Sequence, residues 1–165
     1  MSDLIQTVRS VLEITPSRWQ ALLGSLPAGL LTRQPAPGEW SAVDCLGHLV
    51  DTEQWVFSVR LQAFLDGKDS FPAFDPDAEG TPPETGGAPA RVGERFTDLR
   101  RSNLALLDQM TEAHLSRVAR HAELGPVTLA EMLNHWAAHD FNHTVQAERA
   151  LMQPFILGCG PWESY

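Results

Sequence analysis

Apolar residues recur at helical spacing in four stretches of the chain, and turns rich in proline and glycine separate these stretches. An amphipathic helix places its apolar side chains three and four positions apart, whereas a half-buried strand alternates apolar and polar positions. No run of the sequence shows such strict alternation. The pattern therefore predicts an all-α chain with four amphipathic helices.

The first stretch runs from Leu4 to Leu23 and is interrupted at Thr15 and Pro16. Threonine is a good helix cap, and proline is well tolerated in the first turn of a helix. A proline inside a helix bends it, because it lacks the backbone N–H and its ring clashes with the preceding turn. The stretch predicts either one bent helix or two.

The second stretch begins with Ser41 and Asp44, a serine/aspartate version of the capping box, and is expected to end at Gly67. It carries two stripes on nearly opposite faces. One stripe consists of Leu46, Val50, Phe57, Leu61 and Phe64, and the other consists of His48, Thr52, Trp55 and Val59. A helix with two such faces is expected inside a bundle.

Residues 67–93 are dense in proline and glycine and predict no regular element. Loops of this length are uncommon in compact domains and are often functional. Two interpretations stay open: a crossover that also acts as a lid, or a plain connector between the second and third helices. Residues 153–165, around Pro154, predict a C-terminal tail.

The third stretch predicts a helix from Val92 to Ala113. Its expected buried residues are Phe96, Leu99, Leu106 and Met110, and its expected solvated face holds Arg95, Asp98, Arg100 and Arg101. A less regular segment with His114 and His121 follows. Thr128 and Glu131 then form a capping box that predicts the start of the fourth helix.

Composition indicates one ordinary globular domain over residues 1–165, because 43% of the 165 residues are hydrophobic. The formal charge of −9 repels phosphate backbones, and no basic patch appears, so nucleic acid is not expected as a partner. No apolar run approaches the roughly 20 residues that cross a bilayer. The first residues also lack the pattern of a signal peptide, and the expected location is therefore the cytoplasm, without membrane binding.

Cys45 and Cys159 form no CxxC motif, so reduced thiols are expected. Cys45 precedes His48 by three residues and is within reach of any metal bound there. A lone cysteine on a helix more often fills the core, and this is the favoured interpretation.

Three of the six histidines, His135, His139 and His143, lie four residues apart in the fourth stretch. Residues spaced in this way project from one face of a helix, close enough to share an ion. A single histidine on a helix is usually a packing or surface residue. Three on one face favour metal binding, because burying several unpaired imidazoles is costly.

Two pairs of motifs carry a family resemblance. The first pair is Gly38-Glu39-Trp40-Ser41 with the segment from Leu46 to Glu53, and the second is Thr128-Leu129-Ala130-Glu131 with the segment from His139 to Gln146. In this order, over nearly the whole chain, they resemble the DinB/YfiT-like superfamily. The resemblance implies a four-helix bundle with up-down-down-up connectivity and a long crossover between helices two and three. It also implies a divalent metal ion held by His48, His139 and His143, with His135 not required as a ligand.

Helix geometry agrees with this set of ligands, because two histidines on one helix cannot enclose an ion without a third from a facing element. His48 is the only histidine of the second stretch. Three histidines with one position left for water or substrate are typical of catalytic zinc sites. Zinc or nickel is the expected ion, although three imidazoles also suit iron or copper. His135 is expected to support the site or to fill the core.

Such an ion lowers the pKa of bound water, or it holds a thiol as thiolate. Relatives in this superfamily include S-transferases and isomerases that use low-molecular-weight bacterial thiols, as well as metal-dependent hydrolases. The resemblance therefore favours a metal-dependent S-transferase acting on a small thiol and an electrophile. The alternatives are a metal-dependent hydrolase, a noncatalytic metal-binding or stress-response protein, and a helical interaction protein without an ion.

Glu53, Asp140 and Gln146 are candidate auxiliary residues, for which a structural role is favoured over a catalytic one. Glu53 is placed to orient a ligand or to pair with Arg60. Asp140 follows the first histidine of an HxxxH spacing where zinc proteases need glutamate, and no GxSxG or nucleotide-binding loop is present. The aromatic residues of the tail, Trp162 and Tyr165, suit either a homodimer contact or packing on their own bundle.

Overall fold

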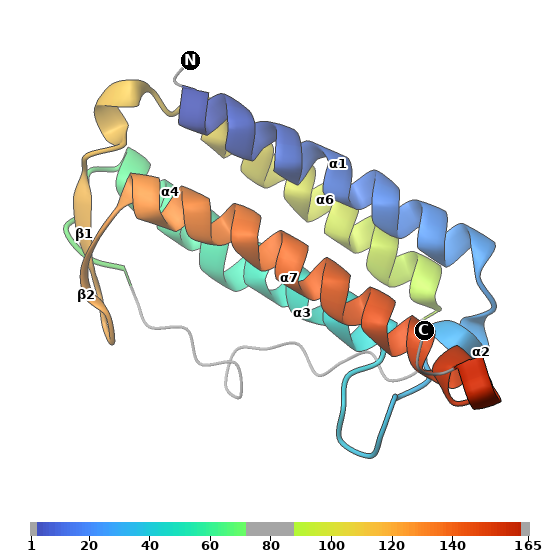
Figure 1. Cartoon of the computed structure of the whole chain (residues 1–165). Helices are drawn as coiled ribbons and strands as arrows, with labels where there is room; N and C mark the ends of the chain where they lie inside the picture. The colour runs from blue at the N-terminus through green and yellow to red at the C-terminus, as the bar shows by residue number, and fades with distance from the viewer. Residues whose placement is uncertain (1–2, 72–87, 163–165) are drawn as a thin grey trace.

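The computed structural model describes residues 3–71 and 88–162, which form a bundle of four long helical rods (Figure 1). The rods are α1 (Asp3–Ser25), the continuous run of α3 (Ala42–Thr52), η1 (Glu53–Phe57) and α4 (Ser58–Leu65), then α6 (Pro89–Leu107) and α7 (Leu129–Ile156). Three short helices lie between or after them: α2 (Ala28–Leu31), η2 (Glu112–His114) and η3 (Gly160–Trp162). The expected four-helix bundle is confirmed.

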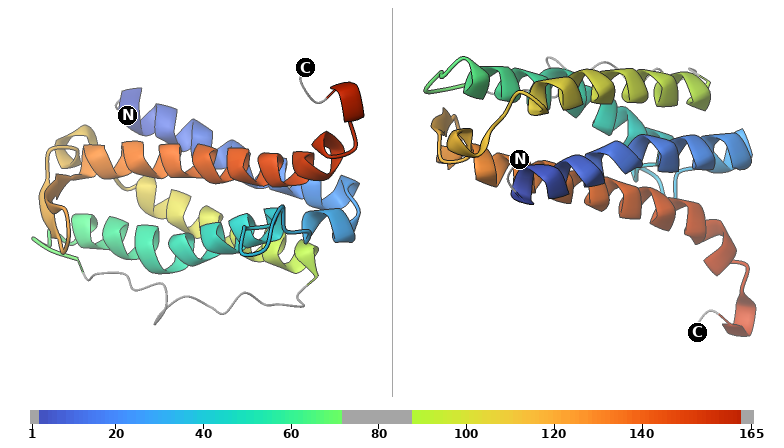
Figure 2. Two further views of the ribbon diagram at one scale, coloured as in Figure 1. Left: turned by 60° about the horizontal axis from the view of Figure 1, so that its bottom comes forward. Right: turned by 90° about the horizontal axis from the view of Figure 1, so that it is seen from above.

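Helix α1 packs mainly against α6, and α3 packs mainly against α7. Figure 1 shows α1 and α7 running in one direction along the bundle, while α3, α4 and α6 run in the opposite direction. The two views of Figure 2 show the same four rods side by side, with η3 turned away from the bundle. The facing pair α3 and α7 carries the candidate metal ligands. Within the described residues, no helix combines the length and the apolar character needed to cross a bilayer.

Both predicted capping boxes are present. The Ser41 hydroxyl accepts a hydrogen bond from the Asp44 amide, and the Asp44 carboxylate accepts one from the Ser41 amide at 2.8 Å. Thr128 and Glu131 make the same reciprocal pair at the start of α7. These caps fix where the two site-bearing helices begin, because they satisfy backbone donors that the helix itself leaves free.

Pro16 and Pro154 both lie inside helices. α1 is a single helix that contains Pro16, which settles the choice between one helix and two, and the Thr15 hydroxyl donates to the Val11 carbonyl at 3.0 Å. α7 continues through Pro154 to Ile156, past the position where the sequence predicts a tail. Only two residues follow Pro154 in the helix, so the missing N–H falls within its last turn. Trp162 is 73% exposed and Tyr165 lies outside the described residues, so the homodimer stays a prediction.

The third helix begins and ends earlier than expected. It starts at Pro89, in a position where proline is favoured, and it ends at Leu107, whereas Ala113 belongs to the separate turn η2. Of the predicted crossover 67–93, residues 72–87 lie outside the described residues. Its interpretation as a lid or as a connector stays open.

A small hairpin departs from the all-α expectation. Strand β1 (Val118–His121) pairs antiparallel with β2 (Gly125–Thr128), with Val118 opposite Thr128 and His121 opposite Gly125. Only Ala119 of these strands is buried, so the sequence lacks the alternation that predicts a strand. β2 ends at Thr128, the residue that caps α7. The hairpin thus leads directly into the helix that carries two of the histidines.

The core consists of two apolar clusters with a polar layer between them. On each long helix, buried apolar residues of one cluster give way to buried polar residues and then to residues of the other cluster. The polar residues between the clusters are Thr15 on α1, Thr52 and Glu53 at the α3–η1 junction, Arg100 and Asn103 on α6, and Asp140 and Thr144 on α7. The predicted apolar stripe of the second helix, Leu46 to Phe64, is buried throughout.

Candidate metal centre

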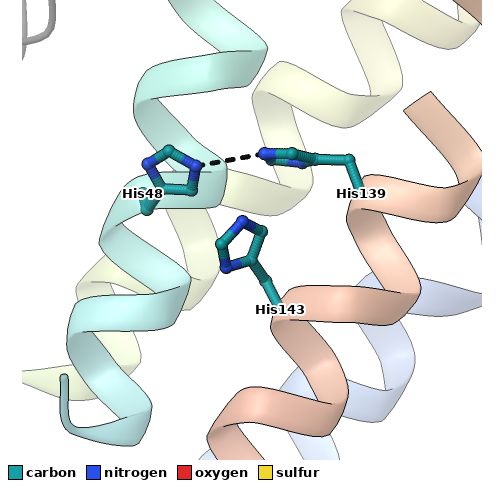
Figure 3. A group of neighbouring side chains, drawn as sticks. All are labelled: His48, His139 and His143. Atoms are coloured by element: carbon teal, nitrogen blue, oxygen red, sulfur yellow. Dashed lines mark hydrogen bonds between the residues drawn. The ribbon is translucent and has the colours of Figure 1, made fainter. Parts of the chain in front are cut away.

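The structure brings His48 of α3 together with His139 and His143 of α7 (Figure 3). The Nε2 atoms of His48 and His139 lie 3.0 Å apart. The ring of His143 lies with its centroid 4.4 Å from each of the other two rings. One ring nitrogen from each residue falls within 4.8 Å of the others. The packing of α3 on α7 therefore produces the convergence that the sequence predicts.

These distances fit one divalent ion. Zinc–nitrogen bonds of about 2.0–2.1 Å in tetrahedral geometry place two ligand nitrogens about 3.3 Å apart. The 3.0 Å separation of the His48 and His139 nitrogens is close to that value, and the ligand nitrogens of all three histidines lie within 4.8 Å of one another. Three imidazoles from two helices leave at least one coordination position for another ligand.

The protein environment keeps the three imidazoles neutral. Burial, together with the nearby His143, lowers the pKa of His48 to about 4. Burial and the neighbouring histidines lower the pKa of His139 to about 3, and burial also lowers the pKa of His143. A neutral imidazole carries the lone pair that a metal ion requires. The donor set is therefore ready for a cation at neutral pH.

Gln146 orients His143. The Nδ1 atom of His143 lies 2.9 Å from the Gln146 side-chain oxygen, which can only accept a hydrogen bond. The proton of neutral His143 therefore lies on Nδ1, and the lone pair of Nε2 is free for an ion. This contact is typical of the outer partners that fix the tautomer of a metal-binding histidine. The Nδ1 atom of His139, in contrast, has no hydrogen-bond partner among the described residues.

Two aromatic rings cover the site. Trp40, in the loop before α3, stacks on His143 with ring centroids 5.9 Å apart and lies 5.1 Å from the ring of His48. Phe57 meets the ring of His139 edge-on at 5.7 Å. From the sequence, Trp40 is recognised only as part of the motif Gly38–Ser41, without this contact. No helical periodicity extends into the loop that holds it.

The largest correction concerns Arg100, which the sequence places on the solvated face of its helix. The side chain is 1% exposed and makes two ion pairs, one with Asp140 and one with Glu53. Burial alone would lower the pKa of the guanidinium, but the two carboxylates raise it above its ordinary value. The only local signal for this burial is weak: Arg100 shares helical spacing with the apolar Phe96 and Leu107, which are also buried.

Glu53 joins the same buried network. Its Oε1 accepts hydrogen bonds from Arg100 and from the indole N–H of Trp136, and its Oε2 accepts one from the Asn103 side-chain amide. The predicted pairing of Glu53 with Arg60 is wrong, because Arg60 instead lies 3.0 Å from His121. Glu53 begins a five-residue π-helical segment, a distortion that often occurs at functional sites.

The network connects the elements that carry the ligands. Asp140 lies next to His139 in α7, and the Arg100 guanidinium also donates to the Leu12 carbonyl of α1 at 2.9 Å. Arg100 therefore connects α6 to α1, to α7 and to η1, the π-helical segment that directly follows α3. The structural role favoured for Glu53 and Asp140 agrees with these contacts.

The remaining candidates lie outside the cluster. His135 is exposed, with its ring centroid 5.8 Å from that of His139, so it does not fill the core. Cys45 is fully buried among apolar residues, and burial raises the pKa of its thiol to about 12. Cys45 is therefore a core residue, as favoured from the sequence.

A pocket of about 460 Å³ adjoins the histidines. The loop before α3 forms one wall and α7 forms the other, and two of its lining residues, Trp40 and Gln146, also contact His143. This volume lies within the range of small-molecule sites. The arrangement thus offers a metal position next to a space for a small ligand.

Comparison with known proteins supports this architecture. A family model described as the DinB superfamily matches residues 12–147. Among solved structures, YfiT from Bacillus subtilis matches with a TM-score of 0.78 at 18% sequence identity, over 94% of this chain and 90% of that one. YfiT is described as a probable metal-dependent hydrolase with an unusual four-helix bundle topology. No curated protein sequence matches the chain.

Proposed function

The chain belongs to the DinB superfamily, and from this membership and the geometry of its three histidines we propose that it is a metal-dependent enzyme. More specifically, we propose an S-transferase that joins a low-molecular-weight thiol to an electrophile at a divalent ion, zinc or nickel. The proposed ligands are His48, His139 and His143. The convergence of these imidazoles beside an open pocket is the observation that carries the proposal.

When bound at such a site, a divalent ion lowers the pKa of a coordinated thiol or water and so supplies a nucleophile near neutral pH. The protein contributes the rest. The three neutral imidazoles hold the ion, Gln146 fixes the tautomer of His143, and Trp40 shields one side of the site from water. In the transfer, the thiol sulfur forms a bond to the electrophilic carbon, the leaving group departs with its electron pair, and the thiol proton passes to solvent.

The pairing of the buried Glu53 and Asp140 carboxylates favours a thiol over water as nucleophile. Water attack benefits from a general base that takes up a proton during the reaction. The two auxiliary candidates among the carboxylates, Glu53 and Asp140, are 1% exposed and paired with Arg100. Such pairing keeps them from acting as bases. A thiol, once ionised, attacks without one.

Metal-dependent hydrolysis is the second candidate, because the fold matches that of YfiT, a protein described as a probable metal-dependent hydrolase. In that case water would take the place of the thiol, and the same three histidines would hold the ion. The thiol dependence of turnover separates the two candidates.

The test is a screen of the zinc-loaded and nickel-loaded protein with electrophiles such as 1-chloro-2,4-dinitrobenzene and several small thiols. We expect thiol conjugation above the uncatalysed rate in the wild type and its loss in His143→Ala, with His135→Ala as the matched control. Equal rates in wild type and His143→Ala would contradict the proposal. Turnover of ester substrates without thiol would favour the hydrolase.

A further inference from the structure

The pocket beside the histidines has two walls of different origin. One wall is the loop with Pro35, Gly38, Glu39 and Trp40, and the other is a face of α7 with Gln146, Arg149, Ala150 and Gln153. The α7 residues follow the spacing of one helix face, and that face continues from His143. The pocket therefore lies beyond His143 on α7, toward the C-terminal end of the helix.

Among the described residues that line this pocket, Arg149 is the only cation. Neither its guanidinium nor the Glu39 carboxylate makes an ion pair with another residue in the described part of the chain. Arg18, in contrast, is paired at 3.2 Å with Glu148, the residue before Arg149. A guanidinium left free in a pocket is suited to bind a carboxylate through two parallel hydrogen bonds.

We propose that Arg149 binds the carboxylate of the thiol substrate, so that the enzyme acts on anionic low-molecular-weight thiols. This inference rests on the S-transferase function proposed above. The side-chain amides of Gln146 and Gln153 line the same wall and add hydrogen-bond donors for the carboxylate. Glu39, on the opposite wall, disfavours an anion on its own side and directs the carboxylate toward α7.

The spacing along α7 sets the length of the substrate. Arg149 follows His143 by six residues, which corresponds to about 9 Å along the helix axis. A thiol whose carboxylate lies at a comparable distance from its sulfur can reach both the metal position and Arg149. The chain carries a net charge of −9, so the attraction for an anion here is local to Arg149 rather than a property of the whole surface.

The test compares two thiols of equal length, 6-mercaptohexanoate and 6-mercapto-1-hexanol, which differ in the charge of the far end. Each is titrated into cobalt-substituted protein, whose visible absorption changes when a sulfur joins the coordination sphere. We expect the wild type to bind the acid about fivefold to tenfold more tightly than the alcohol, as suits a charge-assisted contact in a partly open pocket. Binding is measured without turnover.

Three variants make the test specific. Arg149→Gln is expected to bring the acid-to-alcohol affinity ratio to about one, and Glu39→Gln is expected to increase it, because a like charge is removed. Arg101→Gln removes the same charge from a side chain that is 73% exposed and outside the pocket, and it should leave the ratio unchanged. A loss of folding or of metal would weaken the binding of both thiols equally and would leave the ratio unchanged.

The experiment distinguishes a failure of the proposed role of Arg149 from a failure of the proposed S-transferase function. An unchanged ratio in Arg149→Gln, or a wild type that prefers the alcohol, would overturn the role of Arg149 while leaving the S-transferase function intact. If neither thiol alters the cobalt spectrum, the proposed S-transferase function itself fails, and this inference falls with it.

Discussion

The guanidinium of Arg100 donates to both carboxylate oxygens of Asp140, at 2.7 and 2.8 Å, and both side chains are 1% exposed. Asp140 follows His139 directly in α7, so the contact holds the metal-binding face of this helix against α6. A buried ion pair adds little net stability by itself, but breaking one leaves an uncompensated charge.

Arg100→Met is therefore expected to lower the free energy of unfolding of the metal-free protein by about 3–5 kcal/mol, because Glu53 and Asp140 lose their counter-charge. The measurement is urea unfolding followed by circular dichroism. Arg101→Met is the matched control; its side chain is 73% exposed, and the expected change is within about 0.5 kcal/mol. Similar losses in both variants would show that Arg100 is no more important than a surface arginine.

Gln146→Ala removes the acceptor that fixes the tautomer of His143. Loss of such an outer partner typically weakens metal binding about 10-fold to 100-fold. We expect a decrease of this size in zinc affinity, measured by competition with a chromophoric chelator. Gln109→Ala, which removes a glutamine in the turn after α6, serves as the control. An unchanged affinity in Gln146→Ala would mean that the contact does not orient the ligand.

The two cysteines should differ in reactivity. Cys159 is exposed, whereas Cys45 is buried with a pKa raised to about 12, and only the thiolate is nucleophilic. At pH 8 we expect Ellman's reagent to label one thiol per native chain quickly and the second only at the rate of unfolding. The Cys159→Ala variant should lose the fast phase. Two fast equivalents in the wild type would contradict the burial of Cys45.

The stability of the metal-free protein should fall as the medium becomes acidic. The pKa values of His48 and His139 in the folded state, about 4 and about 3, lie below the ordinary value of 6.5. Below pH 6.5 these histidines therefore bind protons in the unfolded chain but not in the folded chain. The free energy of unfolding consequently decreases as the pH falls from 6.5 toward 4.

Urea midpoints measured between pH 7.5 and 5 check this expectation. The His139→Gln variant has one such group fewer, and its midpoint should depend less on pH than that of the wild type. An equal pH dependence in the two proteins would show that His139 titrates normally.

Much of the scaffold follows from local sequence. Capping boxes at Ser41 and Thr128 depend only on contacts three residues apart, and they correctly mark where α3 and α7 begin. The spacing of His139 and His143 is likewise local. That His48 meets them required the family resemblance, because nothing in the sequence of α3 specifies which face of α7 it contacts.

The features that could not be predicted from the sequence depend on distant residues or on weak local patterns. Arg100 is buried because Glu53 and Asp140, 47 and 40 residues away, neutralise it, and no local pattern contains those partners. The hairpin has too few buried residues to show alternation. Arg149 lies in a pocket only because the loop before α3 forms the opposite wall, and the sequence of α7 does not predict this contact.

The central claim, that three imidazoles from α3 and α7 hold one divalent ion, is tested most directly by calorimetric titration of the metal-free protein with zinc. We predict one equivalent of zinc per chain in the wild type and in His135→Ala, and loss of this tight binding in His48→Ala, His139→Ala and His143→Ala. Absence of tight binding in the wild type, or its persistence in all three ligand variants, would contradict the claim.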